Sequence, residues 1–187
     1  MSGVRASSSS FSSLAMVLAA ALLAGGCGKS TPRTSGRPPG TSPASTSGAS
    51  GAAGEETAPE VSNATDLHAK PQVSPGRGPK PTRLVTKDLV PGTGAEATPA
   101  AVVQVQYLGV NFDDGREFDS SWSRGQPADF PLDRVVPGFS QGIAGMKVGG
   151  RREIVIPPQL GYGARGSPPV VAPNETLVFV VDLLAVK

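Results

Sequence analysis

The C-terminal half of the sequence lacks the residue types that most enzymes use for nucleophilic or metal-assisted chemistry. From Pro81 to Lys187 there is neither histidine nor cysteine. Catalytic Ser-His-Asp and Cys-His arrangements and the usual zinc sites are therefore excluded within this segment. Carboxylates, aromatic rings and tyrosine hydroxyls remain as the groups available for binding or catalysis, and we expect no metal and no cofactor.

Two groups of carboxylates differ in their local setting. Asp113 and Asp114 precede Gly115, a pattern typical of a tight hairpin turn, and are interpreted as solvated turn residues rather than as a catalytic acid and base. Asp119 directly follows Phe118 at the end of an extended segment, in an aromatic neighbourhood. A carboxylate in such a place requires hydrogen-bond donors, so Asp119 is the stronger candidate for a site.

The pattern around these residues predicts an antiparallel sheet. In the segment 102–108, Val103, Val105 and Tyr107 alternate with Gln104 and Gln106, as in a half-buried strand. Further extended segments are expected at 84–89, at 117–119, near Phe130, at 151–156 and at 176–186.

One short helix is expected over 137–146, because Phe139, Ile143 and Met146 share a helical face and Pro137 stands at its start. The fold class is therefore α+β: a curved antiparallel sheet of about five or six strands wrapped on one short helix. Residues 81–187 are expected to form this domain.

Several motifs in this half resemble the FKBP-type peptidyl-prolyl cis/trans isomerase family. They are the runs Tyr107-Leu108-Gly109, 115–121 (GREFDSS), Val136-Pro137-Gly138-Phe139, 145–150 (GMKVGG), 156–163 (IPPQLGYG) and 173–179 (PNETLVF). They occur in the family's order and spacing over roughly residues 83–187. The resemblance implies the family's fold, which agrees with the fold expected from the residue pattern.

The resemblance also implies the residues of a proline-binding pocket. The implied catalytic set is Tyr107, Phe118, Asp119 and Tyr162. The implied substrate-binding set is Val135, Val136, Phe139, Phe179, Arg124 and Phe130. In this scheme Phe139 is the pocket floor, Tyr162 donates to a substrate carbonyl, and Arg124 or Tyr107 holds Asp119.

The implied activity is rotation about the peptide bond before proline in exported polypeptides, a reaction that needs no nucleophile. Macrolide immunosuppressants are candidate ligands. Phe139 in place of the family's Trp should preserve an apolar surface, but Ala128 in place of Phe and a shortened connection at 132–135 keep a second hypothesis open. That alternative is a non-catalytic proline-peptide binding or chaperone module of the cell envelope.

The N-terminus has the plan of an export signal. Arg5 and a serine run precede an apolar stretch over about 14–24, which is shorter than the ~20 residues of a membrane-spanning helix. The following Leu23-Ala24-Gly25-Gly26-Cys27 resembles the lipobox of bacterial lipoproteins. We therefore expect a signal peptide over 1–26 and lipidation of Cys27, with a plain secretory signal and an incidental thiol as the alternative.

Residues 27–80 are rich in Ser, Thr, Ala, Gly and Pro, and are expected to form a disordered tether. His68, the single histidine of the chain, lies there without other metal-ligating residues nearby and is assigned no role. The formal charge of +2 gives no indication of nucleic-acid binding. The expected protein is a monomer, lipid-anchored on the extracytoplasmic side of the cell membrane, or else secreted or periplasmic.

Overall fold

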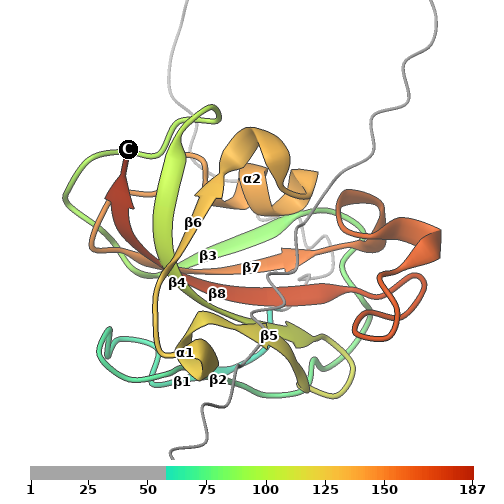
Figure 1. Cartoon of the computed structure of the whole chain (residues 1–187). Helices are drawn as coiled ribbons and strands as arrows, with labels where there is room; N and C mark the ends of the chain where they lie inside the picture. Colours follow the sequence, from blue (N-terminus) through green and yellow to red (C-terminus); the bar gives the residue numbers. More distant parts are fainter. Residues whose placement is uncertain (1–57) are drawn as a thin grey trace, which may run out of the picture.

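The computed structural model describes residues 58–187, whose main element is a six-stranded antiparallel sheet (Figure 1). The strands are β3 (Val85–Val90), β4 (Val102–Asn111), β5 (Glu117–Ser120), β6 (Ala128–Pro131), β7 (Arg151–Ile156) and β8 (Leu177–Val186). Their order is β3-β7-β8-β4-β5, and β6 also pairs with β4. The predicted α+β class is confirmed, and each of the six expected extended segments is a strand.

Strand β4 follows the predicted alternation only over its first half. Val103, Val105 and Tyr107 are buried on the face that carries the main core, while Gln104 and Gln106 on the other face are half-buried. From Leu108 onward every residue of β4 is buried. This half of the strand is therefore covered on both faces of the sheet.

Helix α2 (Pro137–Ile143) covers the main-core face of the sheet, above it in Figure 1. Phe139, Ile143 and Met146 are all buried, as the helical spacing predicted, although the helix ends at Ile143. Gly138 and Gly142 let the helix approach β7 closely, since a Cβ atom on either would lie 2.4–2.5 Å from a side-chain carbon of Ile156 or Ile154. The glycines that make this helix weak in isolation thus permit its packing.

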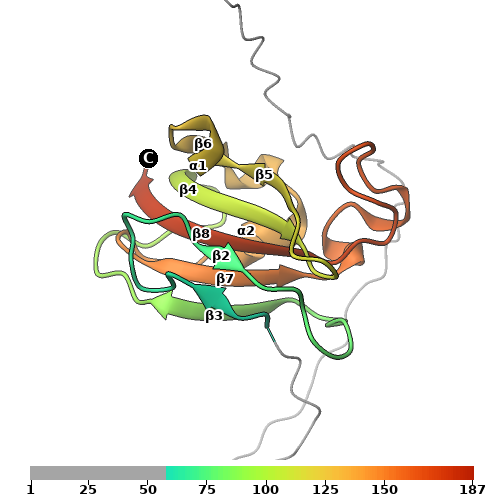
Figure 2. The same ribbon diagram turned by 90° about the horizontal axis from the view of Figure 1, so that it is seen from below.

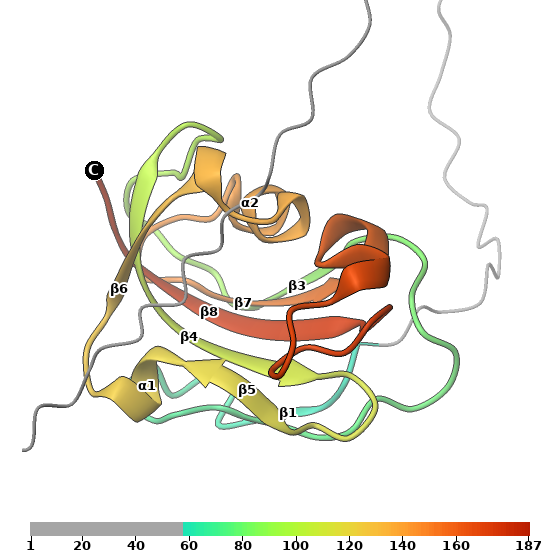
Figure 3. The same ribbon diagram turned by 45° about the vertical axis from the view of Figure 1, so that its right-hand side comes forward.

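A second helix, α1 (Ser121–Arg124), connects β5 to β6, which pair with different halves of β4. Strand β5 pairs with β4 at residues 108–110, and β6 pairs with β4 at residues 102–105. The one-turn helix occupies the gap between these two pairings, beside Tyr107. Figure 3 shows β5 and α1 together at this edge of the sheet. A single helix was expected from the sequence, and α1 was not predicted.

The remaining helical turns are short 3-10 helices in the connections. They are η1 (Leu132–Arg134), η2 (Pro158–Leu160) and η3 (Gly163–Arg165). The turn between β4 and β5 is formed as predicted, with Gly115 at a φ of 67° and Asp113 and Asp114 exposed. None of the helices among residues 58–187 is long and apolar enough to cross a membrane.

The opposite face of the sheet is covered by residues 58–76, which we call the N-terminal strap. It contains a two-stranded hairpin of β1 (Val61–Ser62) and β2 (Gln72–Val73), seen in front of the sheet in Figure 2. Val73 and Ala58 pack against a second buried cluster. The buried members of that cluster are Leu108, Val110, Phe112, Val155 and Val178.

A buried arginine fixes the strap by its backbone. Arg151 on β7 is completely buried and forms a two-pronged ion pair with Asp182, through Nε to Oδ1 and Nη2 to Oδ2 at 2.5 and 2.7 Å. Its Nη atoms also donate to the carbonyl oxygens of Asn63, Asp66 and Ala69. A guanidinium has five donors in a planar fork, which suits it to binding a carboxylate and several carbonyls at once.

The strap differs from the sequence-based expectation. Residues 58–80 were assigned to the tether because they offer few apolar side chains, but in the structure they contact the domain. Much of the contact is made by strap carbonyl groups that receive hydrogen bonds from Arg151, and backbone groups leave no signal in composition. The signal peptide, Cys27 and the rest of the expected tether lie outside the described residues.

Candidate functional site

Five aromatic side chains, drawn from four strands and helix α2, form one cluster on the main-core face of the sheet. Phe139 on α2 is at its centre, with its ring centroid 5.0 Å from that of Phe179, 5.6 Å from Phe130 and 6.4 Å from Tyr107. Phe118 lies 5.5 Å from Phe179 in an edge-to-face arrangement. Apart from Tyr162, the aromatic residues predicted for the site therefore lie in one cluster, and Phe139 is buried at its centre.

Gly109 makes room for two of these rings. A Cβ atom at this position would lie 2.8 Å from Cζ of Phe118 and 3.0 Å from Cε1 of Phe179. Gly109 on β4 pairs with Asp119 on β5, next to Phe118. Because Gly109 has no side chain, the ring of Phe118 can lie over β4 at this position. Gly109 is part of a family motif, but the sequence alone gave it no predicted role in the site.

Asp119 is held by both residues predicted as its partners, Tyr107 and Arg124. The Tyr107 hydroxyl donates to Asp119 Oδ2 at 2.5 Å, and Arg124 Nη1 donates to Asp119 Oδ1. Arg124 Nη2 also donates to the Tyr107 hydroxyl oxygen at 2.7 Å, and the guanidinium lies 5.3 Å from the tyrosine ring centroid. Both carboxylate oxygens therefore have a strong donor, and the side chain retains 19% of its exposure.

The electrostatics of this network keep Tyr107 protonated. Burial, together with the hydrogen bond to the Asp119 carboxylate, raises the pKa of the Tyr107 hydroxyl well above its ordinary value. Burial and the nearby Asp119 charge likewise raise the pKa of Tyr162 to about 12. Both hydroxyls are therefore proton-bearing donors at any physiological pH, and neither can act as a base.

Helix α1 puts Arg124 within reach of this network. Ser120 caps the helix, accepting a hydrogen bond from the Ser123 backbone N–H, and Gly125 ends it with a φ of 74°. Because neither β5 nor β6 pairs with β4 at Tyr107, its N–H donates instead to Ser121 Oγ at 2.7 Å. Ser121, which is completely buried, thus replaces a strand partner at the residue that carries the Tyr107 hydroxyl.

The remaining predicted residues border the same cluster. Val135 and Val136 are buried in the main core just before α2, and Val136 is the cap of that helix. Tyr162 is half-buried between η2 and η3 and packs against the same core. Figure 3 shows the connection between β7 and β8, which carries Tyr162, beside helix α2.

Ser121 is a residue of the site that sequence reasoning missed. Ser121 belongs to a family motif but was assigned no role, because a serine pair after Asp119 gives no signal for a contact that replaces a strand partner. Its neighbour Gln106, which receives a hydrogen bond from Ser121 Oγ, was interpreted only as an outward-facing strand residue. The available signal was a second serine, Ser121, directly after the short β4–β5 hairpin. It indicates a contact with Tyr107 only once the register of β5 and β6 on β4 is known.

The arrangement suits binding better than bond-breaking chemistry. It offers an apolar aromatic surface bordered by an anchored carboxylate and by the Tyr162 hydroxyl. Across residues 58–187, no cluster of three or more histidine, cysteine or acidic side chains is placed to hold a metal ion. An apolar surface with one edge of hydrogen-bonding groups is well matched to a proline ring and its flanking amides.

Comparison with known proteins supports this interpretation. The family model for FKBP-type peptidyl-prolyl cis-trans isomerase matches residues 94–184. A protein of Corynebacterium glutamicum named "Probable FK506-binding protein" is 50% identical over 116 residues, which are 62% of this chain and 98% of that protein. The FK506-binding protein of Streptomyces anulatus is 49% identical over 120 residues, covering 63% and 97%.

Solved structures agree in fold as well as in sequence. The crystal structure of FkpA from Escherichia coli superposes with a TM-score of 0.54 at 45% identity, and the match covers 57% of this chain but only 49% of FkpA. AtFKBP13 gives a TM-score of 0.52 at 32% identity over 57% of this chain and 95% of that structure. The chain therefore belongs to the FKBP-type peptidyl-prolyl cis–trans isomerase family.

Proposed function

We propose that this protein accelerates cis–trans rotation of X-Pro peptide bonds in polypeptides outside a bacterial cytoplasmic membrane. The observation that carries the proposal is the joint presence of the aromatic cluster around Phe139 and the Tyr107–Asp119–Arg124 network at its edge. Membership of the isomerase family supports it independently.

The chemistry required is modest and matches what the site offers. Rotation must overcome amide resonance, with a barrier of about 18–20 kcal/mol, while the two isomers before proline differ by about 0.5–1 kcal/mol. The twisted amide has less charge separation than the planar one, so an apolar pocket that excludes water favours the transition state. No nucleophile or general base is needed, in keeping with the lack of histidine and cysteine after Pro81.

The roles of the residues follow from their positions. The ring of Phe139 would support the substrate proline, with Tyr107, Phe118, Phe130 and Phe179 as walls. Tyr162 would donate its hydroxyl to a carbonyl of the peptide. Asp119, fixed by two donors, would present a constant negative charge near the twisting amide without reorganising during the reaction.

Catalysis of a proline-limited refolding reaction tests the proposal on a protein substrate. The full chain should accelerate the slow refolding phase of such a substrate, and Phe118→Ala should reduce this acceleration while the variant remains folded by circular dichroism. A well-folded wild-type chain that leaves the slow phase unchanged, yet still binds the unfolded substrate, would favour the non-catalytic peptide-binding alternative.

The same cluster is proposed to bind macrolides of the FK506 type. Two relatives that match over almost their whole length are named "Probable FK506-binding protein" and "FK506-binding protein". FK506 should therefore compete with peptide substrates, and Phe139→Ala should weaken both interactions in parallel. Inhibition by FK506 that survives Phe139→Ala would place the macrolide elsewhere.

The proposed location rests on the sequence of the N-terminus. Cys27 would carry a lipid, and the residues between it and the strap would link the domain to the membrane surface. Radioactive palmitate should label the wild-type chain in a bacterial host and should not label Cys27→Ala, which should leave the membrane fraction. Label retained by the variant would contradict lipidation at Cys27, and a monomer is expected in sedimentation experiments.

A further inference from the structure

Lys70 connects the N-terminal strap to the elements that carry Asp119 and Arg124. Its ammonium donates to Glu117 Oε2 at 2.6 Å and to Ser123 Oγ at 2.9 Å. Ser123 Oγ in turn donates to Glu117 Oε1 at 2.6 Å. Three side chains from the strap, from β5 and from α1 thus form one closed set of hydrogen bonds.

The two partners of Lys70 are close in sequence to the proposed catalytic residues. Glu117 begins β5, two residues before Asp119, and Ser123 immediately precedes Arg124 in α1. Strand β5 is at the edge of the sheet, its pairing with β4 shifts register between Gly109 and Val110, and α1 is one turn long. These elements have limited support of their own, so a contact that links them can affect the geometry of the carboxylate and the guanidinium.

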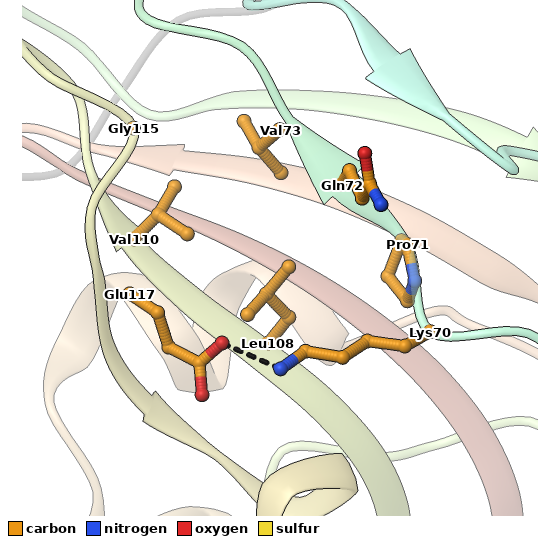
Figure 4. Close-up of a pocket in the computed structure, with 8 residues that line it drawn as sticks. All are labelled: Lys70, Pro71, Gln72, Val73, Leu108, Val110, Gly115 and Glu117. Atoms are coloured by element: carbon orange, nitrogen blue, oxygen red, sulfur yellow. Dashed lines mark hydrogen bonds and ion pairs between the residues drawn. The ribbon is translucent and has the colours of Figure 1, made fainter.

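Side-chain packing between the strap and β5 is incomplete at this place. An open pocket of about 280 Å³ lies between the strap and the edge of the sheet formed by β4 and β5, and its lining includes Val73 of the strap, Leu108 and Val110 of β4, and Glu117 of β5 (Figure 4). The figure shows the Lys70–Glu117 ion pair spanning the space beside these apolar side chains. At Lys70 the strap therefore contacts β5 through an ion pair, beside a gap in the apolar packing.

The charges at this contact are arranged favourably. Burial of the Glu117 carboxyl opposes ionisation, but hydrogen bonds from Lys70 and Ser123 outweigh it and lower the pKa of Glu117. The Lys70 and Glu117 side chains keep 39% and 35% of their exposure, and exposed ion pairs of this kind add little to global stability. A displacement of about 1 Å in an active site can nevertheless cost about 10²-fold in rate.

From this geometry we propose that Lys70 is a positioning residue for the isomerase site, acting through Glu117 and Ser123 on Asp119 and Arg124. The inference rests on the proposed isomerase function and extends it to a segment outside residues 94–184, the part that matches the family model. The strap then belongs to the catalytic unit rather than to the tether.

The test compares Lys70→Ala with Lys80→Ala in the full chain. Lys80 is a matched control, because it also forms an exposed 2.6 Å ion pair from the N-terminal segment, but with Asp113 in the turn between β4 and β5. Lys70→Ala should lower kcat for a proline tetrapeptide by about three- to tenfold with little change in KM, since the apolar floor is untouched. Lys80→Ala should leave both constants unchanged, and the two melting temperatures should be similar.

Two further readouts separate positioning from general destabilisation. Lys70→Arg should restore most of kcat, because a guanidinium can donate to both Glu117 and Ser123. In ¹⁵N NMR spectra, Lys70→Ala should shift the side-chain resonances of Arg124 and speed their exchange with water, whereas Lys80→Ala should not.

The possible outcomes are distinct. An active wild type with equal kcat for Lys70→Ala and Lys80→Ala would overturn the inference and leave the proposed isomerase function standing. An inactive wild type would contradict the isomerase function itself, and the Arg124 spectrum would still decide whether Lys70 holds the network. Unchanged Arg124 resonances in Lys70→Ala would overturn the inference whatever the activity.

Discussion

The Tyr107 hydroxyl donates a 2.5 Å hydrogen bond to Asp119 Oδ2 and at the same time accepts one from Arg124 Nη2. The tyrosine is almost fully buried, whereas Asp119 keeps part of its surface at the edge of the aromatic cluster. One side chain therefore links the apolar floor to the charged rim. The carboxylate is held in place by a group that is itself fixed in the core.

Removing only this hydroxyl tests the network. Tyr107→Phe keeps the ring contacts with Phe130 and Phe139 but leaves Asp119 with one donor, so kcat/KM should fall about tenfold, or roughly 1.4 kcal/mol in the transition state. Loss of a buried hydrogen bond should cost about 1 kcal/mol in unfolding free energy. Tetrapeptide kinetics and urea unfolding measure the two effects. Unchanged kcat/KM in the folded variant would show that Asp119 needs no support from Tyr107.

The close approach at Gly109 makes a second prediction. In Gly109→Ala the new Cβ would lie 2.8 Å from Phe118 Cζ, so the ring must move out of the cluster. Unfolding free energy should fall by about 1–3 kcal/mol, and isomerase activity should fall more than the unfolded fraction explains. Adding Phe118→Leu should recover part of the stability but not the activity. Full recovery of both would mean that the Phe118 ring has no part in catalysis.

The strap should depend on the buried Arg151–Asp182 pair. Arg151→Met leaves an unpaired carboxylate and three unsatisfied strap carbonyls, and should reduce unfolding free energy by about 3–5 kcal/mol. Amide hydrogen exchange over residues 61–73 should quicken selectively. Arg152→Met is the matched control, since Arg152 bonds to Asp88 and to carbonyls at the end of α2 instead of to the strap. Equal exchange in both variants would contradict the assigned role.

The double substitution Arg151→Met with Asp182→Leu separates the two functions of the arginine. Replacing both charges by apolar groups should restore much of the stability that Arg151→Met alone loses. The strap carbonyls would still lack their donor, so exchange over residues 61–73 should remain fast. Slow exchange in the double variant would show that the strap is held without Arg151.

A buried acid under the strap predicts how stability varies with pH. Glu153 on β7 is completely buried and neither carboxylate oxygen has a hydrogen-bond partner. Burial, only partly offset by Lys87, raises its pKa from 4.5 to about 7. The folded chain thus holds a proton that the unfolded chain releases, so the contribution of Glu153 to stability is fully present below about pH 4.5 and is lost as the pH rises through about 7.

Glu153→Gln should remove this contribution. The melting temperature of wild type should drop between pH 5 and pH 7.5 more than that of the variant, and at pH 8 the variant should be the more stable by up to ~3 kcal/mol. Asp182 and Glu175 also have pKa values raised by burial, so the difference between the two proteins is the quantity to compare. Parallel pH profiles for both would contradict the assignment to Glu153.

The sheet, the helix and the clustering of the aromatic residues could be predicted because their signals are local. Each of these signals lies within one short stretch of sequence. They are the alternation in β4, the spacing of Phe139, Ile143 and Met146, and the family motifs. Asp119 could be singled out because a carboxylate beside Phe118 needs donors. These features also agree with one another, which is expected of a sequence that specifies a single fold.

The strap and α1 could not be predicted for a related reason. The strap binds Arg151 by its backbone carbonyls, so its own side chains carry little information, and the matching signal lies some eighty residues away in β7. Helix α1 has four residues, too few for any periodicity, and depends on a gap in the pairing along β4. Both depend on contacts between distant segments rather than on local pattern.

The rate of cis–trans exchange in a proline tetrapeptide, measured by NMR with the full chain and with Asp119→Ala, tests the central claim most directly. We predict exchange well above the uncatalysed rate for wild type, and a loss of at least tenfold for a folded Asp119→Ala variant. A folded wild-type chain that leaves the exchange rate at its uncatalysed value for several residues before proline would contradict the claim.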